Sequence, residues 1–96
     1  MYHSFGVIAF AAMIIASTSV AQAAPEDDLK QATARIASNP NNPDAYTKRM
    51  NILSQMGRYQ EAANDLATQC QLTPDPDVKE LCESELSEYK QMHGLR

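Results

Sequence analysis

Residues 43–74, PDAYTKRMNILSQMGRYQEAANDLATQCQLTP, decide the fold of this 96-residue chain. Apolar residues recur in this stretch three or four positions apart, which is the spacing of one face of an α-helix. Gly57 interrupts the pattern, and Pro43 stands where a helix favours proline, at its first position. The stretch therefore predicts two helices, over residues 43–56 and 59–72, joined by a short turn into a hairpin.

The same signals extend outward on both sides of the hairpin. Acidic residues open a helix expected over residues 26–38, because carboxylates stabilise the positive end of the helix dipole. Asp75-Pro76-Asp77 repeats the start signal Asn42-Pro43-Asp44 and begins a helix expected over residues 76–93. No stretch alternates between apolar and polar residues with a period of two, so we expect an all-α fold of about four helices in antiparallel hairpins.

Residues 1–23 differ in composition from the rest of the chain. They contain none of the 8 Lys and Arg or the 12 Asp and Glu, and they end in Ala21-Gln22-Ala23, with small residues at the two positions that signal peptidase requires. We therefore expect a signal peptide at residues 1–23, cleaved after Ala23, and an exported domain at residues 24–96, either periplasmic or secreted. The alternative is an uncleaved inner-membrane anchor, because the uncharged run from Phe5 to Ala24 is long enough to cross a bilayer.

The hairpin resembles a tetratricopeptide repeat, a helical unit whose family binds other proteins. Gly57 and Tyr59 match the G-x-Y of the turn between the two helices, and Pro74 matches the proline that closes the unit. The residues that match packing positions of the repeat are Tyr46, Gly57, Tyr59, Ala62, Leu66 and Pro74. The sequence departs from the pattern at Arg49 and Met50, which stand where the family usually has leucine and glycine.

The resemblance extends beyond the hairpin. Residues 29–40 resemble the second helix of a preceding repeat, and the last helix resembles a capping helix. The start signals also recur, since Pro40 and Pro74 are 34 positions apart and Pro43 and Pro76 are 33 apart. Such a period is typical of stacked helical hairpins. The alternative is an unrelated bundle of helical hairpins.

The resemblance also implies where a partner binds. Five polar residues match the positions of the first helix that line the concave groove of the repeat, and they are Asp44, Thr47, Asn51, Ser54 and Gln55. This row implies binding of a peptide or helix from a protein partner. Repeats that hold a terminal carboxylate use lysine and asparagine here, and this chain has Asn51 but Thr47 in place of the lysine. The alternative is an ordinary solvated helix face.

Cys70 and Cys82 are the two cysteines of the chain. We expect a disulfide between them, because an exported protein meets an oxidising compartment and the count is even; two buried free thiols are the alternative. A metal site formed with His93 would have three ligands, whereas structural zinc sites usually take four. We therefore expect neither a metal nor another cofactor.

Charge and length limit the function. A net charge of −4 argues against nucleic acid and anionic membranes as partners, and no phosphate-binding loop or activated nucleophile is evident. We expect no enzyme but an exported scaffold or adaptor that binds another protein, without membrane contact after signal cleavage. The alternatives are a structural subunit of an envelope complex and a thiol- or metal-dependent enzyme. Opposite charge on residues 44–60 and on the segment from Asp75 also permits self-association.

Overall fold

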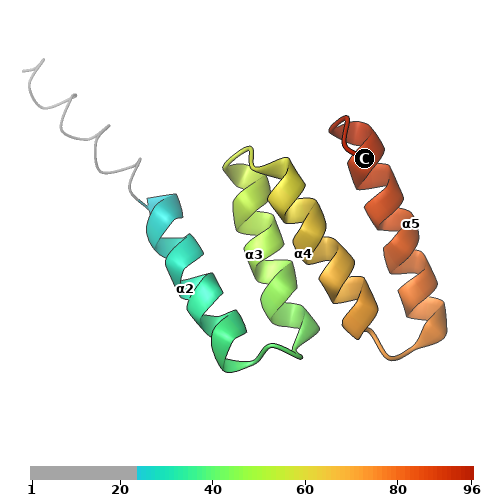
Figure 1. Cartoon of the computed structure of the whole chain (residues 1–96), viewed down its shortest axis with the longest axis horizontal. Coiled ribbons are helices and arrows are strands. Elements are labelled where there is room, and N and C mark those ends of the chain that lie inside the picture. The colour runs from blue at the N-terminus through green and yellow to red at the C-terminus, as the bar shows by residue number, and fades with distance from the viewer. Residues whose placement is uncertain (1–23) are drawn as a thin grey trace, which may run out of the picture.

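The computed structural model describes residues 24–96, so the expected signal peptide and its cleavage lie outside the described residues. The described chain is all-α, as predicted, with helices side by side in chain order (Figure 1). They are α2 (Ala24–Ser38), α3 (Pro43–Gln55), α4 (Tyr59–Leu72) and α5 (Pro76–Met92). α2 begins two residues before its predicted start, whereas α3 and α5 end one residue early. Across residues 24–96, every helix is too short or too polar to cross a lipid bilayer.

Side-chain caps fix where α3 and α5 begin. The Asn42 carboxamide oxygen accepts a hydrogen bond from the Asp44 amide at 3.0 Å, and the Asp75 carboxylate accepts one from the Asp77 amide at 2.9 Å. Each cap satisfies an amide that has no partner within its helix. Gly57 ends α3 with a φ of 77°, a left-handed conformation that costs glycine little because it lacks a Cβ.

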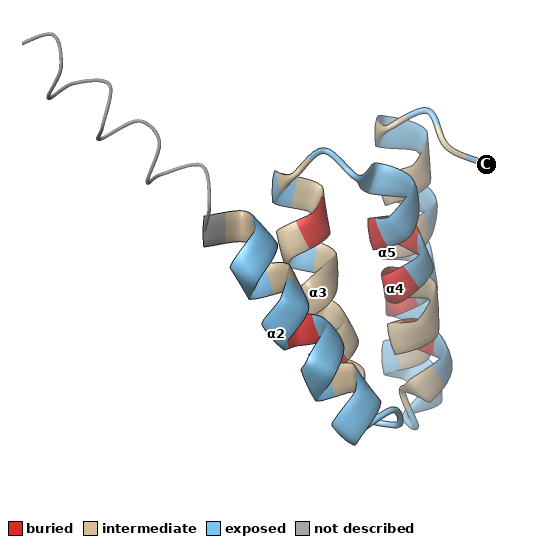
Figure 2. Cartoon of the chain, turned by 60° about the vertical axis from the view of Figure 1, so that its left-hand side comes forward, coloured by how far each residue is buried: buried red, intermediate tan, exposed pale blue. Residues whose placement is uncertain are grey.

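The tightest packing lies between α3 and α4. Ala62 has no exposed surface and Ala63 is 1% exposed, so the backbones of the two helices approach closely. Leu53 and Leu66 are also buried, and Figure 2 shows buried segments in α3 and α4. Burial of such side chains is the main favourable term in folding, at about 25 cal/mol per Å² of apolar surface.

α5 is attached to α4 near its middle and at its C-terminal end. A disulfide joins Cys70 to Cys82, which confirms the expected pairing, and both sulfurs lie in the core beside Leu66. At the C-terminal end, the His93 ring stacks on Tyr59 with 3.8 Å between ring centroids. Because the two attachments are far apart along α5, they fix its orientation against α4.

A further contact joins α5 to α3. The hydroxyl oxygens of Ser54 and Tyr89 lie 2.7 Å apart and share a hydrogen bond. The Tyr89 ring also contacts His93, with 4.6 Å between centroids. The end of α5 is therefore held by aromatic contacts to α4 and by a hydrogen bond to α3.

α2, like α5, buries few of its side chains. Ala32 is its one buried side chain among those that the structure describes, while Leu29 and Ile36 are half-buried. These three residues are spaced three or four positions apart and form one face. α2 packs on α3 through this face, and no other helix of residues 24–96 lies on its outer side (Figure 1).

Replacing Cys70 and Cys82 by alanine is expected to lower the free energy of unfolding by about 3 kcal/mol, because the disulfide closes a short loop of the unfolded chain. Urea denaturation followed by circular dichroism measures the loss. Reductant should cause a similar loss in the wild-type protein and none in the double variant. Wild-type stability that is unchanged after complete reduction would contradict this structural role.

Candidate protein-binding groove

A groove runs along the seam between α2 and α3. It consists of two hollows, of about 330 Å³ and about 230 Å³, that share Arg35, Lys48 and Asn51. The other lining residues are Asp28, Gln31, Ala32 and Ile52 in the larger hollow, and Asn42, Asp44, Ala45 and Thr47 in the smaller. Both helices supply the walls, so the groove depends on the register in which they pack.

Small side chains form the floor of the groove. Ala32 of α2 is 7% exposed and Ala45 of α3 is 2% exposed, and Ile52 is half-buried beside them. Alanine at these positions lets the two helices approach and leaves an apolar strip between polar rims. Such a combination of apolar floor and polar rim is typical of surfaces that bind proteins.

The centre of the groove carries two free cations. Arg35 and Lys48 are exposed, line both hollows, and form no ion pair with any residue in the range 24–96. Asp28 lines the larger hollow and Asp44 the smaller, so the acids of the groove flank its cationic centre. A carboxylate at the centre of a bound segment would meet both cations at once.

The structure brings three of the five predicted binding residues into this groove. Asp44, Thr47 and Asn51 line the hollow at the beginning of α3. Ser54 and Gln55 line neither hollow, and the Ser54 hydroxyl is already bonded to α5. The groove therefore runs between α3 and α2, and it does not follow the whole predicted row along α3.

Sequence reasoning missed Arg35 and Lys48 as groove residues. Lys48 belongs to the positively charged region of residues 44–60, but it does not match a groove position of the repeat. Arg35 belongs to another helix, and no local pattern fixes how α2 lies against α3. The available signal was the excess of positive charge near Lys48, which indicates attraction of an acidic partner.

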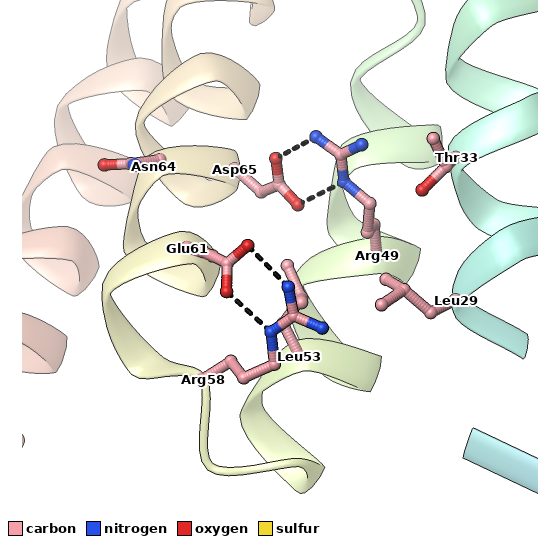
Figure 3. Close-up of a pocket in the computed structure, with 8 residues that line it drawn as sticks. All are labelled: Leu29, Thr33, Arg49, Leu53, Arg58, Glu61, Asn64 and Asp65. Atoms are coloured by element: carbon pink, nitrogen blue, oxygen red, sulfur yellow. Dashed lines mark hydrogen bonds and ion pairs between the residues drawn. The ribbon is translucent and has the colours of Figure 1, made fainter. Parts of the chain in front are cut away.

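A third hollow, of about 290 Å³, lies between α2, α3 and α4 and contains two arginine–carboxylate pairs (Figure 3). Arg49 donates from Nε and Nη2 to the two oxygens of Asp65, at 2.8 Å each. Arg58 donates in the same way to Glu61, at 2.6 and 2.8 Å. All four charged residues that line this hollow are thus paired, and it offers no free charge to a ligand.

The pair of Arg49 and Asp65 explains a departure from the repeat pattern. Asp65 is 4% exposed, and its hydrogen bonds with Arg49 raise the pKa of that guanidinium above its ordinary value. Bidentate bonding neutralises a carboxylate that would be costly to bury alone. Arg49 therefore links α3 to α4 at a position where the repeat usually has leucine.

The three residues considered as metal ligands do not come together. Cys70 and Cys82 are bonded to each other, and His93 lies against Tyr59 at the far end of α5. Within residues 24–96, no three His, Cys, Asp or Glu side chains gather in a way that would hold a metal ion.

No protein-family model, curated protein or solved structure shows significant similarity to this chain.

Arg49→Leu is expected to lower the free energy of unfolding by about 2–4 kcal/mol, because it leaves the Asp65 carboxylate buried without a partner. Urea denaturation measures the loss. Adding Asp65→Asn removes the stranded charge and should recover at least half of it. If the double variant is no more stable than Arg49→Leu alone, the unpaired charge of Asp65 is not the cause of the lost stability.

The pKa of Glu61 lies below its ordinary value of 4.5, because Arg58 donates hydrogen bonds to the carboxylate and attracts its charge. A lowered folded-state pKa means that the pair stabilises the fold above the ordinary pKa, and that this contribution is lost as pH falls through the folded value. Titration of the Glu61 side-chain carbon by NMR should therefore show a midpoint below 4.5. Arg58→Gln should raise that midpoint, whereas Lys90→Gln should leave it unchanged; equal effects of the two variants would contradict the pairing.

Proposed function

We propose that this chain is an exported adaptor, without chemistry of its own, that binds a carboxylate-bearing helix or peptide of another protein in the α2–α3 groove. The observation that carries the proposal is the pair of free cations, Arg35 and Lys48, above an apolar floor. The floor supplies apolar contact, and the cations select an acidic partner and accelerate its encounter.

The resemblance to a tetratricopeptide repeat supports the same function. Gly57 adopts the left-handed conformation that a tight turn requires, and Ala62 is fully buried where the small residue of the repeat is expected. Asn51, at the family's asparagine position, lines the groove. Thr47 stands where the family has a lysine and carries no charge. Lys48 of α3 and Arg35 of α2 supply positive charge in the groove instead.

The proposed compartment follows from two features of the chain. Residues 1–23 have the composition and final residues of a signal peptide, and a disulfide is typical of oxidising compartments. We therefore place the domain in the periplasm or outside the cell, with an uncleaved inner-membrane anchor as the alternative. The mass of the protein recovered from cells distinguishes a cleaved signal peptide from an uncleaved anchor, because cleavage removes residues 1–23.

A second candidate function is that of a structural subunit in an envelope complex. The exposed apolar residues Val78, Leu81 and Met92 favour it, because exposed apolar surface often marks a permanent interface. An obligate subunit would be recovered only within its complex, whereas an adaptor exchanges with a free folded form.

Photo-crosslinking in intact cells tests the adaptor proposal. A photoreactive amino acid at position 51 should yield discrete adducts with a partner protein, whereas the same residue at exposed position 87 of α5 should not. Adding Arg35→Glu and Lys48→Glu should remove most of the adduct, because the reversed charges repel an acidic partner. Lys90→Glu is the matched control outside the groove. Adducts that are absent, or that persist unchanged after the double reversal, would contradict the proposal.

A further inference from the structure

A row of exposed side chains on α5 takes no part in the fold. Val78, Leu81 and Met92 are 52%, 62% and 76% exposed, and Glu85 and Glu88 between them are also exposed. These five residues are spaced alternately three and four positions apart, so they follow one line along the helix. We call this row the α5 stripe; its two ends are apolar and its centre is acidic.

The α5 stripe is separate from the face by which α5 packs on α4. That face consists of Cys82, Leu86 and Tyr89, which belong to or contact the core around Leu66. Exposed apolar residues beside a packed face mark a candidate docking surface. The distribution of charge along it indicates what it docks against.

Two α5 stripes do not complement each other. Antiparallel pairing of two stripes about Glu85 would bring Glu85 and Glu88 of both copies together. Four carboxylates in one contact repel strongly, and like charges across an interface suppress such pairing. The α5 stripe therefore requires a surface with cations at its centre.

The centre of the α2–α3 groove carries charge opposite to that at the centre of the α5 stripe, and Asp28 and Asp44 flank it. Its centre carries Arg35 and Lys48, which form no ion pair within residues 24–96, above a floor that includes Ala32 and Ile52. Glu85 and Glu88 of a docked α5 would meet these cations, and Leu81 would contact the apolar floor. α2 and α5 stand at opposite ends of the row of helices (Figure 1), so the α5 of the same molecule is separated from its own groove by α3 and α4.

We propose that the α5 stripe of one copy binds in the α2–α3 groove of a second copy of this chain. This inference rests on the proposed function, since it names a partner for the same groove. Every molecule carries one α5 stripe and one groove, so the two are present at equal concentration in solution. The contact is small and partly ionic, so the association is weak and weakens as salt concentration rises.

Sedimentation equilibrium tests the proposal on protein purified after expression of the full-length chain. Mass spectrometry first identifies the N-terminal residue of the purified protein. Wild-type protein should self-associate in a concentration series that reaches about 1 mM. Glu85→Lys with Glu88→Lys, and separately Arg35→Glu with Lys48→Glu, should each weaken self-association at least about tenfold through repulsion. Glu80→Lys with Glu83→Lys makes the same charge change on α5 outside the stripe and should weaken it less.

An equimolar mixture of the two weakened variants should associate again, because each groove then meets a stripe of opposite charge. A mixture that stays monomeric overturns the proposal, as does association that neither double variant weakens. Wild-type protein that remains monomeric throughout, or whose association does not weaken in about 1 M salt, overturns it without reference to any variant. If the wild-type protein is monomeric while position 51 still crosslinks to a different protein, the self-association inference fails and the proposed adaptor function stands.

Discussion

The fold depends on the close contact between α3 and α4. Ala62 and Ala63 remove side-chain volume from this interface, and Arg49 bonds Asp65 across it. Apolar packing and a neutralised buried charge therefore both stabilise the α3–α4 interface. A shift of either helix would leave cavities and break the ion pair. The other two helices are positioned by this pair, since α2 packs on α3 and α5 packs on α4.

The outer helices are held in different ways, and the difference bears on function. α5 is attached covalently through Cys70 and Cys82 and by ring contacts at its far end. α2 and α5 each have one buried side chain among those described, Ala32 and Cys82, but the structure shows no covalent link from α2 to α3, so little holds that wall of the groove. Elements with few buried contacts open at the lowest free energy. A ligand bound across the α2–α3 seam would therefore stabilise α2 by mass action.

The helices could be predicted from the sequence because their signals are local. Asn42, Gly57 and Asp75 each act within a few residues of a helix end. The candidate groove could be predicted only in part: Asn51 followed from the repeat pattern, but Arg35 depends on the register of α2 against α3. The burial of Asp65 could not be predicted from a local pattern either, because it requires Arg49, which lies 16 positions away in the sequence. On α5, Val78, Leu81 and Met92 stay exposed although they are apolar, because the helix packs against few neighbours, which no local pattern predicts.

Native-state hydrogen exchange, followed residue by residue by NMR, tests most directly whether the α3–α4 pair supports the rest of the structure. The backbone amides of α3 and α4 should exchange most slowly, and those of α2 should open at a clearly lower free energy. Reduction of the disulfide should accelerate exchange in α5 more than in α3. Equal protection of α2, α3 and α4, or slowest exchange in α2, would contradict the central place given to the α3–α4 contact.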